Sequence, residues 1–200
     1  VVVSGGGIAL VIFFYLRSRF KTWVLPFVYL GSVGIFGLIA LMGALQKGPL
    51  ASIVYKTSVS LRGEYWQAGI NMANKHPLTG VGMDSYGDWY RRSRDAQAMI
   101  LPGPNTVTNA AHNVVIDIFA YGGYPLLLSY LLILGIGAWA VIRVTLRERK
   151  YDGTFVALTA VWATYELQSI ISINQVGLAI WGWVTVGALV AYEYSTRPIS

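Results

Sequence analysis

The chain has 200 residues, of which 55% are hydrophobic and only 12% charged, and it contains no cysteine. A soluble domain normally carries about twice that share of charged residues, so the composition argues against a soluble enzyme. The lack of cysteine excludes disulfide frameworks and thiolate chemistry, and two histidines leave little room for a histidine-built metal site. The formal net charge of +6 could suggest nucleic acid, but in a membrane chain the position of each cation matters more.

Five apolar segments are candidates for membrane spans, because about 20 apolar helical residues cross the ~30 Å hydrocarbon core of a bilayer. They cover residues 1–16, 24–46, 124–142, 154–173 and 176–192. The first is short and does not begin with methionine, so we interpret it as a span cut at its start and the chain as a fragment of a longer protein. A cleaved signal peptide is the alternative, although the segment has neither a basic beginning nor a small-residue cleavage site.

A glycine pair predicts a kink in the third span. A helical stretch at residues 113–121 comes just before this span, and Gly122 and Gly123 separate the two. Because glycine weakens a helix interior, we predict that the helix bends or breaks within the membrane.

Two short loops next to the spans are basic, and such loops usually face the cytoplasm. The basic residues are Arg17, Arg19 and Lys21 in the first loop and Arg143, Arg147, Arg149 and Lys150 in the second. With five spans, this orientation places residues 47–112 outside and the tail with Arg197 inside. We therefore predict an all-α integral membrane protein with about five transmembrane helices and one long, partly helical extracytoplasmic loop.

The predicted organisation has five parts. Two spans occupy residues 1–46, the extracytoplasmic loop residues 47–112, and the kinked membrane helix residues 113–142. A basic cytoplasmic loop at 143–153 leads to a membrane hairpin with a cytoplasmic tail at 154–200.

The outer loop is too long to be a passive connector, so we expect it to be folded. Residues 61–74 have the apolar pattern of an amphipathic helix, which Pro77 should end. Residues 86–100 predict a second, basic helix, and the Leu-Pro-Gly-Pro-Asn run at 101–105 should break it.

Ala111-His112-Asn113 stands where this loop returns to the membrane, and Asn113 and Asp117 share one face of the following helix. A carboxylate within an apolar span costs roughly 2.5–3.5 kcal/mol, so Asp117 needs a partner or a watery cavity. Two interpretations stay open: a functional site, or an interfacial histidine with a structural carboxylate.

Arginines in the outer loop are candidate phosphate ligands, because the guanidinium fork matches phosphate oxygens. They are Arg62, Arg91, Arg92 and Arg94. A solvated helix face is the alternative. Gly80-Val-Gly82 resembles the start of a nucleotide-binding loop, but without a βαβ unit around it we predict a turn. The polar run at 168–175 either caps the last hairpin or offers amides to a sugar.

Three segments together resemble the O-antigen ligase and O-antigen polymerase-like family of bacterial membrane glycosyltransferases. They are Arg62-Gly-Glu-Tyr-Trp66-Gln-Ala68, His76-Pro-Leu-Thr-Gly80-Val-Gly82, and Ala111-His112-Asn113 with Gly122-Gly123. The histidine followed by ten residues and a glycine, His112 to Gly123, is similar to that family's signature.

The resemblance implies a glycan donor on an isoprenoid (undecaprenyl) pyrophosphate and transfer to a glycan or lipid-glycan acceptor hydroxyl with inversion at the anomeric carbon. It places the protein in the bacterial plasma membrane, among membrane lipids, in cell-envelope polysaccharide or lipopolysaccharide assembly. Members carry further spans before the first one here, so activity is expected of the longer protein. The resemblance implies His112 as the catalytic group and Arg62 at the pyrophosphate, with Trp66, Asn113 and Gly123 in support. From residue chemistry and position we add Arg91, Arg92 and Arg94 at the pyrophosphate and Asp117 in support.

The residue chemistry is compatible with this assignment. Pyrophosphate is a good leaving group, arginines can neutralise its charge, and we expect no metal, no cofactor and no nucleic acid. A histidine with a pKa near the working pH suits a general base.

Two other classes stay open. A transporter or channel subunit would use Asp117 and Glu166 as intramembrane ion sites, although the long outer loop favours the enzyme. A non-catalytic partner in envelope synthesis is the second of these classes. Within the enzyme assignment, the choice between ligase and polymerase and the identity of the acceptor stay open.

Overall fold

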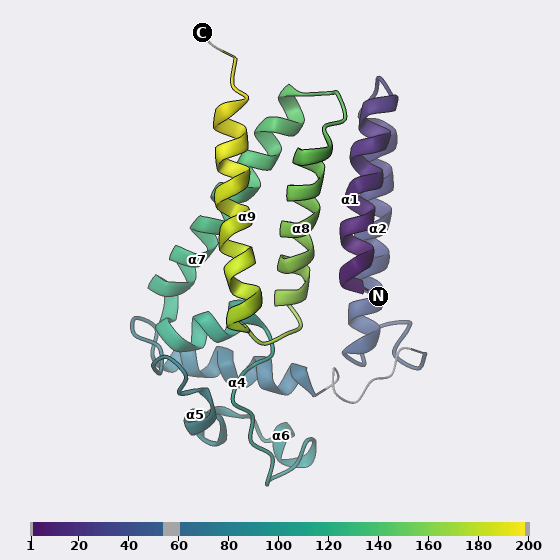
Figure 1. Cartoon of the computed structure of the whole chain (residues 1–200). Helices are drawn as coiled ribbons and strands as arrows, with labels where there is room; N and C mark the ends of the chain where they lie inside the picture. Colours follow the sequence, from purple (N-terminus) through teal and green to yellow (C-terminus); the bar gives the residue numbers. More distant parts are fainter. Residues whose placement is uncertain (1, 54–60, 199–200) are drawn as a thin grey trace. The chain divides into compact units, whose positions relative to one another are not determined.

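The computed structural model describes residues 2–53 and 61–198, and every regular element within these ranges is a helix (Figure 1). The helices are α1 (Val2–Arg19), α2 (Val24–Ala44), α4 (Arg62–Lys75), α5 (Tyr86–Ser93), α6 (Gln97–Ile100), α7 (Val114–Arg147), α8 (Gly153–Ser169) and α9 (Val176–Ser195). The all-α prediction is confirmed for this part of the chain.

Three of these helices, α2, α7 and α9, are long and apolar enough to cross a membrane. They overlap the predicted spans at 24–46, 124–142 and 176–192. Neither α1 nor α8 is among them; the 17 residues of α8 rise only about 26 Å at 1.5 Å each, short of a ~30 Å core. The total of five spans therefore stays a prediction, as does the side on which residues 47–112 lie.

The chain divides into two compact units. We call the first the helical unit; it contains Val1–Gly37, Leu132–Gln168 and Gln175–Ser200. The second, the loop unit, contains Leu38–Leu131 and Ser169–Asn174. Both α2 and α7 begin in one unit and end in the other, so each unit is described separately.

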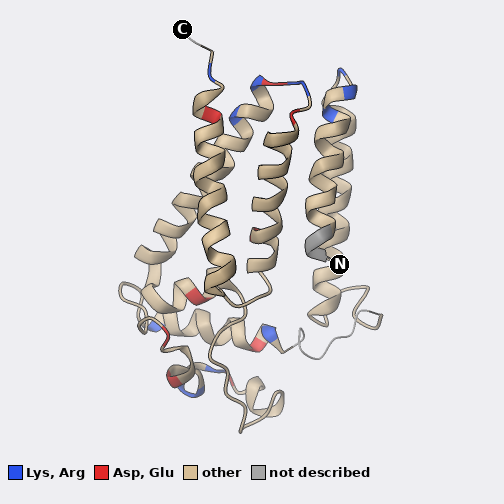
Figure 2. Ribbon diagram, viewed as in Figure 1, with Lys and Arg blue, Asp and Glu red and all other residues tan. Residues whose placement is uncertain are grey.

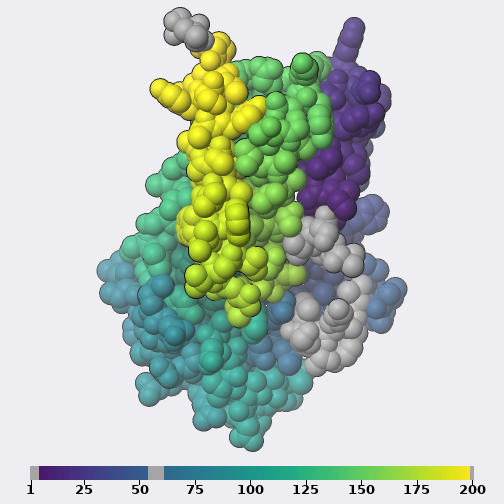
Figure 3. Space-filling view, in the orientation of Figure 1, coloured from purple at the N-terminus to yellow at the C-terminus, as the bar shows by residue number. Residues whose placement is uncertain are grey.

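Aromatic and branched side chains from α1, α7, α8 and α9 form the core of the helical unit. The buried members are Phe13, Phe14, Val144, Phe155, Val156 and Leu189. The outer surface is also apolar: on α9, Val176, Trp181 and Val184 are exposed. Figure 3 shows α8 and α9 side by side on one face of this unit. An apolar outer face over an apolar core is what contact with lipid requires.

The basic segments of the helical unit meet at one end of it (Figure 2). Arg149, after α7, donates a hydrogen bond to the carbonyl of Phe20, after α1. Arg147 contacts Glu193 and Thr196 near the end of α9, next to Arg197. The two basic loops and the tail thus share one end, as their predicted common side requires.

In the loop unit, α4 and α5 pack together around a small core. Its fully buried members are Ala68, Met72, Tyr86, Tyr90, Ala111 and Ala120. The predicted helix at 61–74 is confirmed as α4, whose buried residues Ala68, Gly69, Met72 and Ala73 repeat with helical spacing along one face.

The prediction of one basic helix over residues 86–100 is wrong. Arg94 has an extended backbone (φ −71°, ψ 149°) and separates α5 from α6. The Asn71 amide on α4 donates to the Ser93 carbonyl at 2.9 Å and to the Asp95 carboxylate at 2.8 Å, which anchors the break. Long-range hydrogen bonds therefore end a helix that its own pattern would continue.

Candidate functional site

Asn113 caps the start of α7. Its Oδ1 accepts a hydrogen bond from the Ile116 N–H at 3.2 Å, which satisfies a donor that the first turn of a helix leaves free. One turn later, Asp117 Oδ1 accepts the Ala111 N–H at 2.6 Å. Both side chains are buried. The partner that the buried carboxylate requires is thus a backbone amide, and the two side chains fix the backbone on either side of His112.

His112 lies between these two anchors in a left-handed backbone conformation, with φ +58°. A residue with a side chain pays roughly 1–3 kcal/mol for such strain, and it persists where the surroundings hold it. The half-buried imidazole lies beside Tyr65 of α4, with 6.0 Å between ring centroids. The strained turn therefore directs the imidazole toward α4.

Arg62, the first residue of α4, is the charged neighbour of His112. Burial is the main cause that lowers the pKa of His112, and the nearby positive charge of Arg62 lowers it further. The imidazole is therefore neutral near pH 7. The Arg62 guanidinium donates one hydrogen bond from Nη1 to the carbonyl of Ile171, in the turn between α8 and α9.

Tyrosines connect the site to α5. The hydroxyl of Tyr86 donates to the carbonyl of Tyr65, and burial raises the pKa of Tyr86, which keeps it protonated. The ring of Tyr65 lies between His112 and Tyr90, whose centroid is 5.8 Å away. Tyr65 was not among the predicted site residues. The available signal was its position three residues after Arg62, which puts both on one side of a helix.

The three arginines of the second predicted helix do not act alike. Arg91 and Arg92 are exposed in the last turn of α5. The guanidinium of Arg94 instead donates to the carbonyls of Pro104 at 3.0 Å and Thr106 at 3.2 Å, with a longer contact of 3.5 Å to Gly103. Arg94 thus anchors the loop after α6, whereas Arg91 and Arg92 are exposed, with the guanidinium of Arg92 5.6 Å from the centroid of the Trp89 ring.

Trp66 packs against the core of the loop unit, and its indole Nε1 is buried without an acceptor among the described residues. His76 packs edge-on against Trp89, with 4.9 Å between ring centroids. Trp66 therefore has a packing role, and its indole N–H remains available as a donor. His76 has a packing role at the end of α4.

The predicted turn and the predicted kink are both confirmed, and they contact each other. Gly123 has φ +62° inside α7 and interrupts its helical geometry. The turn backbone bonds to this interruption: Val81 N–H donates to Ala120 O at 2.9 Å, Gly82 N–H to Tyr121 O at 3.1 Å, and Tyr124 N–H to Pro77 O at 2.8 Å.

Glycine is required on both sides of this contact. A Cβ on Gly80 would lie 2.3 Å from the carbonyl carbon of Tyr121, and one on Gly123 would lie 2.2 Å from the carbonyl oxygen of Pro77. The two glycine motifs therefore form one backbone contact, which sets where α7 bends beyond His112.

Within residues 2–53 and 61–198, no group of three or more histidine or carboxylate side chains is placed to hold a metal ion. The chemistry available at this site is that of a neutral imidazole, a guanidinium and tyrosine hydroxyls.

Comparison with known families gives a match over more than half of the chain. The family model described as O-antigen ligase matches residues 1–131, which include α4, the turn after it, His112 and the kink. No curated protein and no solved structure matches the chain.

Proposed function

Because the chain belongs to the O-antigen ligase family, we propose that it transfers a glycan from an isoprenoid pyrophosphate carrier to an acceptor hydroxyl. The family consists of membrane enzymes of ligase or polymerase type in cell-envelope polysaccharide assembly. The observation that carries the proposal for this chain is geometric: His112 lies beside Tyr65, three residues after Arg62 on the same helix. The charge of Arg62 also lowers the pKa of His112, after burial as the main cause.

His112 acts as the general base. Its neutral imidazole takes the proton of the acceptor hydroxyl as that oxygen bonds to the anomeric carbon. The bond from the anomeric carbon to the pyrophosphate oxygen breaks at the same time, and the electron pair leaves with the pyrophosphate. Attack from the face opposite the leaving group inverts the anomeric centre.

Arg62 holds the pyrophosphate and neutralises the charge that develops on it. A guanidinium has five N–H donors, and the single bond to Ile171 leaves others for phosphate oxygens. Arg91 and Arg92, exposed on α5, supply further positive charge to the donor, whereas Arg94 positions the loop after α6. Trp66 supports α4 from the core.

Asn113, Asp117 and Gly123 position the catalytic turn. The first two hold the backbone on either side of His112, and the third allows the bend of α7. The bond from the Ala111 N–H to Asp117 Oδ1 gives this carboxylate a structural role at the start of α7.

The deciding test is glycan transfer by the longer membrane protein with a defined lipid-pyrophosphate glycan as donor. His112→Ala should lower transfer by about 10²- to 10⁴-fold while donor binding persists. His76→Ala is the matched control and should retain transfer, because the imidazole of His76 packs against Trp89. Near-wild-type transfer by His112→Ala would show that another group is the base.

Arg62→Lys separates charge from geometry. Lysine keeps the positive charge but loses the paired hydrogen bonds of the guanidinium fork, so this variant should be impaired as well as Arg62→Ala. If Arg62→Ala binds the donor and transfers glycan like the wild type, Arg62 does not hold the pyrophosphate.

The proposed orientation puts residues 47–112 outside a bacterial plasma membrane and the basic loop at residues 143–153 inside. Since the chain has no cysteine, single probes are unambiguous. Gln97→Cys, at an exposed position, should react with an impermeant thiol reagent on intact cells, and Lys150→Cys should not. The opposite labelling would exclude transfer at the outer leaflet.

A further inference from the structure

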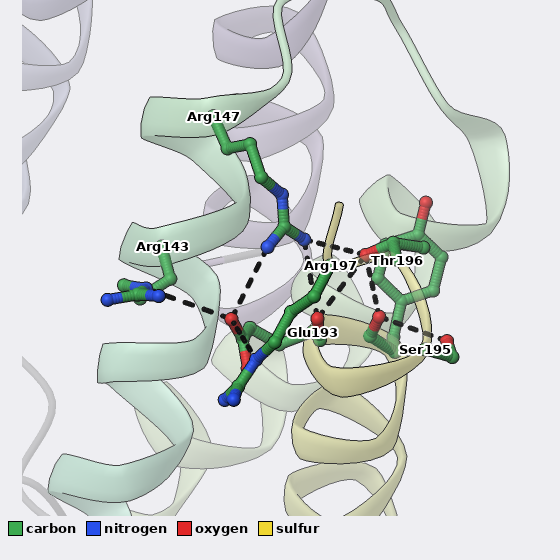
Figure 4. Close-up of polar contacts among 7 residues, drawn as sticks. Arg143, Arg147, Glu193, Ser195, Thr196 and Arg197 are labelled. Carbon is green, nitrogen blue, oxygen red and sulfur yellow. Dashed lines mark hydrogen bonds and ion pairs between the residues drawn. The ribbon is translucent and has the colours of Figure 1, made fainter. Parts of the chain in front are cut away.

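Three arginines converge on one buried glutamate where α7 and α9 end (Figure 4). Glu193 is only 4% exposed. Arg197 binds its carboxylate from Nη2 at 2.6 Å and Nε at 3.0 Å, Arg147 from Nη1 at 3.4 Å, and Arg143 from Nε at 3.7 Å. Arg147 also donates to the Thr196 hydroxyl at 2.7 Å. The glutamate thus holds three guanidinium groups close together.

This cluster carries more positive charge than the glutamate can neutralise. Three guanidinium groups against one carboxylate leave two positive charges. The side chains of Arg143 and Arg197 remain about half exposed, at 49% and 51%. Donors and charge are therefore left for an anion that approaches from outside.

The same arginines line a groove together with Leu146 and Pro198. We call it the arginine groove. Leu146 is 65% exposed, and the nearby Trp139, over which Arg143 lies at 5.9 Å, is 61% exposed. Charged walls beside exposed apolar side chains match a ligand with an anionic head and an apolar tail.

The groove lies at the C-terminal ends of two helices that are long and apolar enough to cross a membrane, α7 and α9. The ends of a membrane-spanning helix lie at the depth of the lipid headgroups. Basic pockets between membrane helices at this depth suit anionic lipid headgroups.

We propose that the arginine groove binds the phosphodiester headgroup of an anionic phospholipid. The phosphate oxygens accept hydrogen bonds from Arg143 and Arg197, and the acyl chains lie along Leu146 and Trp139. Glu193 does not contact the lipid; it keeps the three guanidinium groups in place. This site shares no residue with the site proposed for glycan transfer, and all of its residues belong to the helical unit.

The test counts lipids bound to the purified chain in detergent by native mass spectrometry. Phosphatidylglycerol and phosphatidylcholine with the same short acyl chains are titrated separately. The wild type should bind phosphatidylglycerol at least about tenfold more tightly. Replacing both Arg143 and Arg197 by glutamine should lower the affinity for phosphatidylglycerol by about 30-fold and leave that for phosphatidylcholine unchanged.

Arg19→Gln with Lys21→Gln is the matched control. It removes the same charge from another basic segment of the helical unit, outside the groove, so the affinity should change by less than about threefold. If both double variants lost the same affinity for phosphatidylglycerol, the binding would depend only on net charge, and the proposal would be overturned. Equal wild-type affinity for the two lipids would also overturn it.

Single replacement of Arg143 guards against a folding defect. Its contact with Glu193 is the longest of the three, so Arg143→Gln should keep the melting temperature while losing affinity for phosphatidylglycerol by about fivefold. Wild-type affinity in this variant would refute the site. Inorganic phosphate tests the other source of the same chemistry: if it displaces phosphatidylglycerol at equal concentration, the groove recognises free phosphate and the lipid assignment is wrong.

Discussion

Replacing Gly80 by alanine should break the backbone contact between the turn and α7. Gly80 has φ +61°, and an added Cβ would lie 2.3–2.4 Å from backbone atoms of Tyr121 and Gly122. Backbone atoms cannot rotate away as the end of a flexible side chain can. The turn must therefore move off α7.

The structure sets the size of the effect. Left-handed backbone costs alanine roughly 1–2 kcal/mol more than glycine. Moving the turn also breaks the hydrogen bonds from Val81 and Gly82 to α7, at 2.9 and 3.1 Å, each worth about 1 kcal/mol. We expect a local loss of about 3–4 kcal/mol, which corresponds to a factor of about 10² or more in the opening equilibrium.

Amide hydrogen exchange measures this opening directly. In the Gly80→Ala variant, the amides of Val81 and Gly82 should exchange about 100-fold faster than in the wild type. Gly63→Ala is the matched control: Gly63 is exposed in α4 and has no heavy atom within 4 Å of its Cβ position. It should leave exchange in the turn unchanged and stabilise α4 by up to about 1 kcal/mol. Wild-type protection in Gly80→Ala would show that the contact does not hold the turn.

The other predictions concern the site and its loop. Arg94→Ala should speed amide exchange in the loop after α6 by tenfold or more, since a charged donor is worth about 1.5–3 kcal/mol, whereas Arg91→Ala should not; equal exchange in the two variants would contradict the anchor. Asp117→Ala removes the acceptor of the Ala111 N–H, so transfer should fall by about tenfold or more, as expected for an unsatisfied buried donor, with donor affinity retained; loss of donor affinity alone would indicate a different role. The pKa of His112 is lowered from its ordinary 6.5, so the base is neutral at pH 7 and transfer should fall only as pH drops below that value. Arg62→Gln removes one cause of the lowered pKa and should move this acidic limb to higher pH in a pH–rate profile. An unchanged limb would show that the charge of Arg62 does not affect the pKa of His112.

Features that depend on local pattern were determined by the sequence alone. Apolar runs of sufficient length predicted α2, α7 and α9. A membrane-spanning helix needs about 20 apolar residues, and whether a segment has them can be counted in the sequence itself. The spacing of apolar residues predicted α4, and the glycine pair predicted the interruption of α7 at Gly123.

Only the tertiary structure decided which distant segments meet. Residues 86–100 have one continuous helical pattern, yet the structure breaks the helix at Arg94. There the Asn71 amide donates a hydrogen bond to the Ser93 carbonyl, and the Arg94 guanidinium donates one to the Thr106 carbonyl. The glycines at 80 and 123 each suggested a turn or a kink, but not that the two would bond to each other. Likewise, burial lowers the pKa of His112, and folding brings the charge of Arg62, some fifty residues earlier in the sequence, close enough to lower it further. The physical reason is that periodicity and propensity act over a few residues, whereas the hydrogen bonds and charges that shape the site join backbones brought together only by folding.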